Sequence, residues 1–349
     1  MPGVGSRAGE LESLWLSASP GYVEALAWSP DGSSLAAASV EGPVTLCDAQ
    51  TGEIRHELAG HGFGTAALSW SPDGRVLATA GQDGAARLWD AREGAEISRL
   101  DGGEPWVSRV EYSPDGRYLA TAAGRRLRLW KAARGGCELL WESEDHESTV
   151  TDLRWRPGSS KELVASSYGG LALYKPGSPE PARRFAWKGS TLTIRWSPNG
   201  KYIATGDQDS TVHFWIHATG GDLQMFGYPT KVRELSWSPT SRYLATGGGP
   251  FVTVWDCSGK GPEGTTPISL EAHEDFLTDL AFQLRGPLLA SCAEDGLVAL
   301  WEPGATERPV SAAALEAPAT RLAWSPDDHR LAAGDEAGGV AVYETPRRR

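Results

Sequence analysis

Two sets of His, hydroxyl and Asp side chains recur at one spacing and could do chemistry. They are His61, Thr79 and Asp83, and His273, Ser291 and Asp295. In each set the His precedes the Asp by 22 residues, and a Trp (Trp89 or Trp301) follows the Asp by 6. A His between a hydroxyl and a carboxylate is the arrangement of hydrolase triads. A catalytic site is needed only once, however, so two copies at matched spacing favour a structural role.

The other reactive residue types give weaker signals. His213 and His217 flank Trp215, and in a strand they would share one face. They could contribute to a metal site, but no third ligand lies at a recognisable spacing, so we prefer one packed His and one loop His. Cys257 lies near a Gly-rich stretch and could be a reactive surface thiol. It lacks an activating neighbour, so we expect an ordinary thiol.

The sequence contains no organised cofactor motif. Phosphate-binding loops, dinucleotide-binding glycine motifs, paired-His zinc motifs and calcium loops are all missing from it. We therefore expect no catalytic residue, no metal and no cofactor.

The net charge argues against nucleic acid as the main partner. With 33 Lys and Arg against 45 Asp and Glu, the formal charge is −12, which repels phosphate backbones and anionic membranes. One basic run is an exception, formed by Arg125, Arg126, Arg128, Lys131 and Arg134. We interpret this run as a solvated strand edge, with nucleic-acid association as the less favoured alternative.

The cysteines and the apolar segments indicate a compartment. The four Cys include no CxxC pair, which is typical of a reducing environment. The first ten residues lack an apolar signal region, and no run of 18 apolar residues occurs. We expect a cytoplasmic protein without membrane contact.

An aromatic residue recurs eight times, at intervals of 41 to 45 residues. The leading aromatics are Trp28, Trp70, Tyr112, Trp155, Trp196, Trp237, Phe282 and Trp324. Five of them are followed by Ser-Pro and then Asp-Gly, Asn-Gly or Asp-Asp, which are tight-turn residues. A period of this length indicates a repeat architecture.

One unit reads as four short antiparallel strands. In the second unit, alternation and turn residues predict strands over 65–70, 75–80, 85–89 and 95–100. The middle strands are apolar on both faces, so each sheet must be sandwiched between neighbours. Units packed radially around an axis satisfy this requirement, which predicts an all-β β-propeller.

The chain resembles the WD40-repeat family over nearly its whole length. Trp89-Asp90 and Trp255-Asp256 match the terminal dipeptide of that family, and Gly60-His61 matches its leading dipeptide. The resemblance implies that each His, Ser or Thr, Asp and Trp set is a structural tetrad linked by hydrogen bonds. The fifth unit keeps Thr205, Asp209 and Trp215 without the His.

Counting leading aromatics predicts eight four-stranded blades, with seven as the alternative. The last unit supplies only three strands, and residues 11–17 are strand-like. As in the WD40 family, we expect this N-terminal strand to complete the last blade and close the ring. The predicted organisation is a flexible tail over 1–10, one propeller domain over 11–345 and a basic tail over 346–349.

Large side chains at the mouths of the inner strands are the candidate partner site. They are Tyr22, Phe63, Trp106, Lys231 and Phe276. Loops carry function on such a scaffold, so these residues could anchor a protein or peptide. The alternative is that each ring packs between blades.

Charged residues three positions before the leading aromatics should lie near the channel. They are Arg109, Asp152, Glu234, Asp279 and Arg321. Their mixed signs favour mutual pairing. The preferred function is a non-catalytic scaffold for protein–protein interaction, as a monomer or within a hetero-complex. The alternatives are an enzyme or a small-ligand or metal-binding protein that uses the channel mouth, and a nucleic-acid-associated protein.

Overall fold

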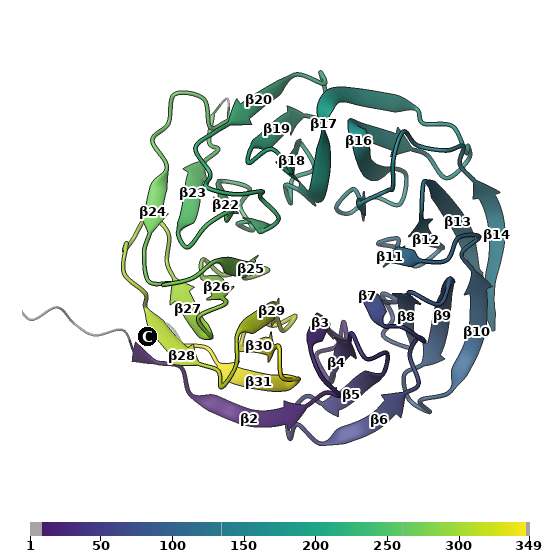
Figure 1. The fold of residues 1–349 in the computed structure, drawn as a ribbon, viewed down its shortest axis with the longest axis horizontal. Coiled ribbons are helices and arrows are strands. Elements are labelled where there is room, and N and C mark those ends of the chain that lie inside the picture. Colours follow the sequence, from purple (N-terminus) through teal and green to yellow (C-terminus); the bar gives the residue numbers. More distant parts are fainter. Residues whose placement is uncertain (1–8, 134, 260, 347–349) are drawn as a thin grey trace, which may run out of the picture.

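A closed ring of β-strands surrounds a central opening (Figure 1). The computed structural model describes residues 9–133, 135–259 and 261–346, and within them every helix or strand element is a β-strand. Eight strands follow one another around the opening, and the last contacts the first. They are β3 (Val23–Trp28), β7 (Thr65–Trp70), β11 (Val107–Tyr112), β15 (Asp152–Trp155), β17 (Arg183–Trp196), β21 (Leu235–Trp237), β25 (Leu277–Phe282) and β29 (Ala319–Trp324).

Apart from the two N-terminal strands described below, the remaining strands pair antiparallel in sequence order from the centre outward. The second strands are β4 (Ser34–Ser39), β8 (Val76–Gly81), β12 (Tyr118–Ala123), β18 (Tyr202–Asp207), β22 (Tyr243–Thr246), β26 (Leu289–Ala293) and β30 (Arg330–Asp335). The third strands are β5 (Val44–Asp48), β9 (Ala85–Asp90), β13 (Arg126–Ala133), β19 (Val212–Ile216), β23 (Val252–Asp256), β27 (Leu297–Trp301) and β31 (Gly339–Glu344). The outer strands are β6 (Ile54–Leu58), β10 (Glu96–Asp101), β14 (Gly136–Glu142), β20 (Asp222–Met225), β24 (Ile268–Leu270) and β28 (Ser311–Ala314).

The number of separate sheets corrects the prediction of eight blades. The described residues form seven hydrogen-bonded sheets, which is the alternative count. The difference arises in the fourth and fifth repeat units, which share one six-stranded sheet. In it, β16 (Leu163–Tyr174) occupies the second and third positions of the fourth unit. The unbroken strand β17 then pairs with β16 through residues 183–190 and with β18 through residues 191–196. No break in pairing therefore separates these two units.

The N-terminal strand closes the ring, as predicted. β2 (Ser13–Ala18) pairs antiparallel with β31 as the outer strand of the last sheet. β1 (Gly9–Glu10) pairs in parallel with β28 of the preceding sheet. The predicted tail over 1–10 is therefore wrong at its last two residues, because their backbone groups continue the pairing. Residues 1–8 and 347–349 of the predicted tails lie outside the described residues.

The repeated turn and the repeated aromatic have separate structural roles. In the second unit the Ser71 hydroxyl donates to Asp73 at 2.7 Å and accepts from the Val76 N–H at 2.9 Å, while Gly74 adopts a φ of 71°. The indole N–H of Trp70 donates to the Ala27 carbonyl in the neighbouring sheet at 3.1 Å. Equivalent bonds join Trp28 to Ala323 and Trp324 to Ala281. Trp155 and Trp237 make the same kind of bond, so five of the eight leading aromatics tie their inner strand to the one before it.

Candidate functional site

Two classes of loop lie together at one end of the ring, which we call the loop rim. One class precedes the inner strands, and the other joins the second and third strands. The Val40 N–H donates to the Tyr22 carbonyl at 3.1 Å, and the Glu294 N–H donates to the Phe276 carbonyl at 2.9 Å. Because such bonds link the two classes, they form one surface.

Phe63 is the most exposed large apolar side chain of the loop rim. Its side chain lies in the loop before β7 and the residue is 85% exposed. Its φ is 67°, in the left-handed region that bulky side chains rarely adopt. Neither burial nor backbone preference therefore favours Phe at this position. Residues held in such conformations cluster at functional sites.

The other predicted rim residues lie on the same end, in separate loops. Trp106 is 64% exposed before β11, and Phe276 and Lys231 are exposed before β25 and β21. Tyr22 is only half-buried, and this burial raises the pKa of its hydroxyl. The alternative was that each aromatic side chain packs between blades. Phe63 and Trp106 are too exposed for that alternative to hold for them. Their role in binding a partner stays a prediction.

Three exposed aromatics of the loop rim were missed by the sequence reasoning. Tyr168 lies between the two halves of β16, Phe226 follows β20, and Phe251 precedes β23. None of them lies six or seven residues before a leading aromatic, where the predicted rim residues lie. Large apolar residues in the Gly-rich loops between second and third strands are the signal that could have found Tyr168 and Phe251.

The structure brings the four residues of the first set together. The His61 Nδ1 is 2.7 Å from Asp83, and its Nε2 is 2.7 Å from the Thr79 hydroxyl. The Trp89 indole N–H donates to the same hydroxyl at 3.0 Å. Burial lowers the pKa of His61 despite the opposing effect of Asp83, which favours a neutral ring. The Thr79 hydroxyl is buried and occupied on both sides, which gives a substrate no access to it.

The second set repeats this geometry. The His273 Nε2 is 2.7 Å from the Ser291 hydroxyl, which accepts the Trp301 indole N–H at 2.8 Å. The distance from His273 Nδ1 to Asp295 is longer, 3.4 Å. Burial lowers the pKa of His273 as well. The sets therefore have the connectivity expected of tetrads, and their structural role stays a prediction.

The fifth unit departs from its predicted set. Trp215 donates to the Thr205 hydroxyl at 3.4 Å, but Asp209 accepts from Thr211 instead. Asp207 contacts Thr205 at 3.4 Å and accepts from the Thr191 hydroxyl at 2.8 Å. Burial raises the pKa of Asp207 to about 7. A buried acid thus replaces the missing His in contacting the Thr.

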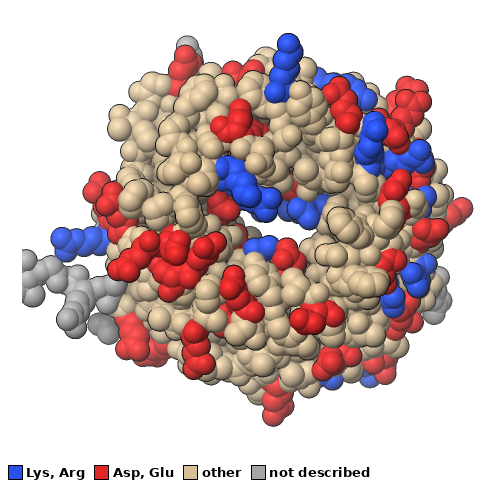
Figure 2. Space-filling model, in the orientation of Figure 1, with Lys and Arg blue, Asp and Glu red and all other residues tan. Residues whose placement is uncertain are grey.

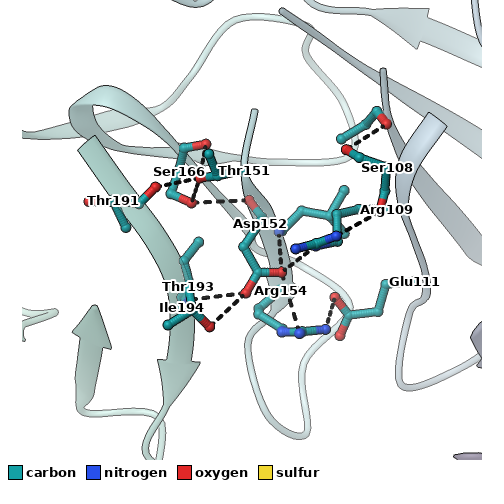
Figure 3. Close-up of polar contacts among 12 residues, drawn as sticks. Ser108, Arg109, Glu111, Thr151, Asp152, Arg154, Ser166, Thr191, Thr193 and Ile194 are labelled. Atoms are coloured by element: carbon teal, nitrogen blue, oxygen red, sulfur yellow. Dashed lines mark hydrogen bonds and ion pairs between the residues drawn. The ribbon is translucent and has the colours of Figure 1, made fainter. Parts of the chain in front are cut away.

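Charged side chains contact one another around the central opening. Mutual pairing was predicted for the charged residues three positions before the leading aromatics, and it is found for some of them. The Arg109 Nε lies 3.3 Å from Asp152, and Arg321 pairs with Glu24 at 2.8 Å. Asp279 accepts the Leu322 and Leu280 N–H groups. Figure 3 shows how Asp152 lies between Arg109 and Arg154. Mutual pairing of the charges is confirmed for Arg109 with Asp152.

Three further residues of this cluster were missed: Glu111, Arg154 and Arg195. They lie one position before a leading aromatic, so they share a strand face with the predicted residues three positions before it. Arg154 and Arg195 contact Asp152 at 3.3 and 3.4 Å. Burial opposes ionisation of Asp152, but Arg154, Arg109 and Arg195 outweigh it and lower its pKa. Burial raises the pKa of Glu111 to about 7, because Arg154 at 3.9 Å compensates only in part.

The weaker candidates are not assembled into reactive sites. His213 is buried 3.0 Å from Asp222, whereas His217 follows β19 and lies 2.8 Å from Glu162. Cys257 is buried, and this burial raises its pKa to about 12, so the surface-thiol alternative is wrong. No group of three metal-ligating side chains occurs among the described residues.

The basic run lies on strand β13 and the turn before it, where carboxylates neutralise part of it. Arg126 pairs with Glu142 and Asp145 at 2.7 and 2.6 Å, and Arg128 pairs with Glu142 at 2.5 Å. Arg134 lies outside the described residues. This pairing supports the solvated strand edge over a nucleic-acid patch. No helix in the described part of the chain has the length and apolar character needed to cross a membrane.

Comparison with a solved structure supports the ring architecture. The computationally designed Ika8 protein superposes with a TM-score of 0.81, over 97% of this chain and all of that one. Its sequence is 21% identical, so the likeness is one of fold.

Curated relatives match over shorter segments. A protein of Mycosarcoma maydis named "Probable cytosolic iron-sulfur protein assembly protein 1" is 27% identical over 47% of this chain and 37% of its own length. The protein of that name from Malassezia globosa is 30% identical over 33% of this chain and 24% of its own length. The match thus spans little more than a third of these relatives at most.

Family models identify the repeats themselves. The model of the WD domain, G-beta repeat, matches residues 52–90, 94–131, 183–215, 221–256 and 264–302. That of the anaphase-promoting complex subunit 4 WD40 domain matches residues 11–63. The five repeat matches together cover more than half of the sequence, and the chain therefore belongs to the WD40-repeat family.

Proposed function

We propose that this chain is a non-catalytic scaffold that binds a protein or peptide partner through its loop rim. The observation that carries the proposal is Phe63, a large apolar residue that is 85% exposed in a left-handed backbone conformation. Burial cannot account for it, but contact with a partner can, because aromatic anchors dominate many interfaces. Trp106 and Phe276 supply further exposed rings on the same rim.

Membership of the WD40-repeat family and the names of the relatives support this proposal. Those relatives are named as cytosolic assembly proteins, which agrees with a cytoplasmic protein that brings others together. Iron–sulfur proteins and the factors that assemble them are accordingly the first partners to look for. Because the match covers only part of each relative, the proposal itself names no partner more specific than a protein or a peptide.

A structural role for both tetrads belongs to the same proposal. Each hydroxyl is buried and engaged by a His and a Trp. Such a chain satisfies buried polar groups and ties the two loop classes together, which keeps the loop rim rigid. A rigid rim reduces the entropy lost when a partner binds.

Affinity capture with matched variants tests the proposal. The tagged full chain is compared with the triple variant Tyr22→Ala, Phe63→Ala, Trp106→Ala, and captured proteins are identified by mass spectrometry. The control variant Ile54→Ala, Leu139→Ala, Leu284→Ala removes exposed apolar side chains outside the loop rim. We expect specific partners to be lost with the rim variant and kept with the control, at unchanged circular dichroism. Retention of every partner by the rim variant would sink the proposal.

A further inference from the structure

The central opening holds an arginine cluster that the rim proposal does not use. Arg109, Arg154 and Arg195 come from the consecutive inner strands β11, β15 and β17. Basic side chains border the opening in Figure 2. We propose that these three arginines bind a small tetrahedral oxyanion of the phosphate type in the central opening.

The three guanidinium groups converge on one carboxylate. Asp152 lies 3.3 Å from Arg109, 3.3 Å from Arg154 and 3.4 Å from Arg195. Its oxygens also accept the backbone N–H groups of Ile194 and Leu153, at 2.9 and 3.0 Å. Asp152 thus already accepts several donors, and it cannot in addition satisfy three guanidinium groups, each of which carries five N–H donors.

Local charge compensation is incomplete. Among the described residues, Asp152 is the one carboxylate within ion-pair distance of Arg109 and Arg195. The second acid of the cluster, Glu111, reaches only Arg154, at 3.9 Å, and its buried Oε2 has no hydrogen-bond partner. Because burial raises the pKa of Glu111 to about 7, it is partly protonated near neutral pH. Three cations therefore face less than two full negative charges.

The other acids around the opening are held by their own partners. Asp279 accepts the N–H groups of Leu322 and Leu280, at 2.9 and 2.8 Å. Glu234 accepts the Gly248 N–H at 3.1 Å. Glu24 pairs with Arg321. These three acids are therefore engaged by groups outside the arginine cluster.

The geometry suits an oxyanion better than a spherical ion. Each of the three arginine side chains is 34% exposed, so part of each side chain faces solvent. Planar guanidinium groups bind phosphate oxygens through paired, charge-assisted hydrogen bonds. Three groups approaching from three strands can engage different oxygens of one tetrahedral anion.

Calorimetric titration of the full chain with inorganic phosphate tests this inference. The buffer contains no other oxyanion, and sodium chloride keeps the ionic strength constant. We expect saturable binding of phosphate and none of additional chloride. Methyl phosphate, titrated in parallel, distinguishes a site for free phosphate from one that also accepts a monoester. Absence of phosphate binding, or an equal response to chloride, would overturn the inference.

Three variants locate the site. Arg109→Gln should weaken phosphate binding about tenfold or more, because a charge-assisted contact is lost. Glu111→Gln should tighten binding, since it removes a competing negative charge, an effect that a merely structural residue would not produce. Arg242→Gln, an exposed arginine paired with Asp256, is the control and should leave binding unchanged. Equal affinity of all three folded variants would contradict the proposed site, whatever the outcome of partner capture.

Discussion

At the scale of single residues, Phe63 combines exposure with an unfavourable backbone conformation. Its φ of 67° suits Gly far better than any residue with a Cβ. We expect Phe63→Gly to be more stable than Phe63→Ala by about 1 kcal/mol, because both remove the ring but only Gly accepts this φ freely. Urea unfolding of the two variants measures the difference. A more stable Ala variant would show that the conformation is not strained.

The tetrads should contribute to stability. Asp83→Ala and Asp295→Ala each leave a buried His without its carboxylate partner. We expect each change to lower the free energy of unfolding by about 1–3 kcal/mol. Asp101→Ala, at a side chain that is 89% exposed, is the control and should have little effect. A hydrolytic activity that either tetrad variant abolishes while still folded would instead assign catalysis to the set.

Asp207 should make stability depend on pH. Burial raises its folded-state pKa to about 7, whereas an unfolded Asp has a pKa of about 3.9. Between these values the folded state holds a proton that the unfolded state releases, so the free energy of unfolding falls as pH rises towards 7. The loss is at most about 4 kcal/mol. Relative to the wild type, Asp207→Asn should gain stability between pH 4.5 and 8 in urea unfolding. A difference independent of pH would contradict this account.

Contacts between residues that recur at a fixed spacing could be predicted from the sequence. Contacts that form only when the ring closes could not. His61 and Asp83 could be connected from their spacing because two copies occur. Arg154 and Arg195 join Asp152 from different strands, and such convergence is visible only once neighbouring strands are in place. The burial of Asp207 could not be predicted for the same reason, because it depends on the neighbouring strands and not on the sequence around Asp207.

At the scale of elements, β2 closes the ring by pairing with β31. Deleting residues 1–20 removes β1 and β2, and we expect a clear fall in the midpoint of thermal unfolding because the edge of β31 loses its partner. Within β2, Trp15→Ala should cost about 3 kcal/mol, since Trp15 is buried and donates to the Ala49 carbonyl at 3.1 Å. Leu16→Ala is the matched control, because Leu16 is 73% exposed. An unchanged midpoint after the deletion would refute closure by β2.

The strands themselves were largely predictable, because turn residues and alternation are local signals. The second unit was expected over 65–100 and contains β7 to β10 over those residues, with ends shifted by one position at most. The number of sheets was not predictable in this way. Whether β17 breaks between two units depends on backbone pairing along 183–196, which neither periodicity nor turn chemistry determines.

At the scale of the whole molecule, the repeated features and the unique ones have different roles. Leading aromatics and turns recur around the ring and hold neighbouring strands together. Phe63, Trp106 and Phe276 occur where the units differ, and they are exposed. Because selection for folding alone does not require them, they are the residues through which this scaffold should act.

The most direct measurement of the central claim is a binding titration between the full chain and its captured partner. We expect the variant Tyr22→Ala, Phe63→Ala, Trp106→Ala to bind at least a hundredfold more weakly, since loss of two or more anchors costs several kcal/mol. The control Ile54→Ala, Leu139→Ala, Leu284→Ala should bind as the wild type does. Equal affinity of the rim variant and the wild type would contradict the loop rim as the binding surface.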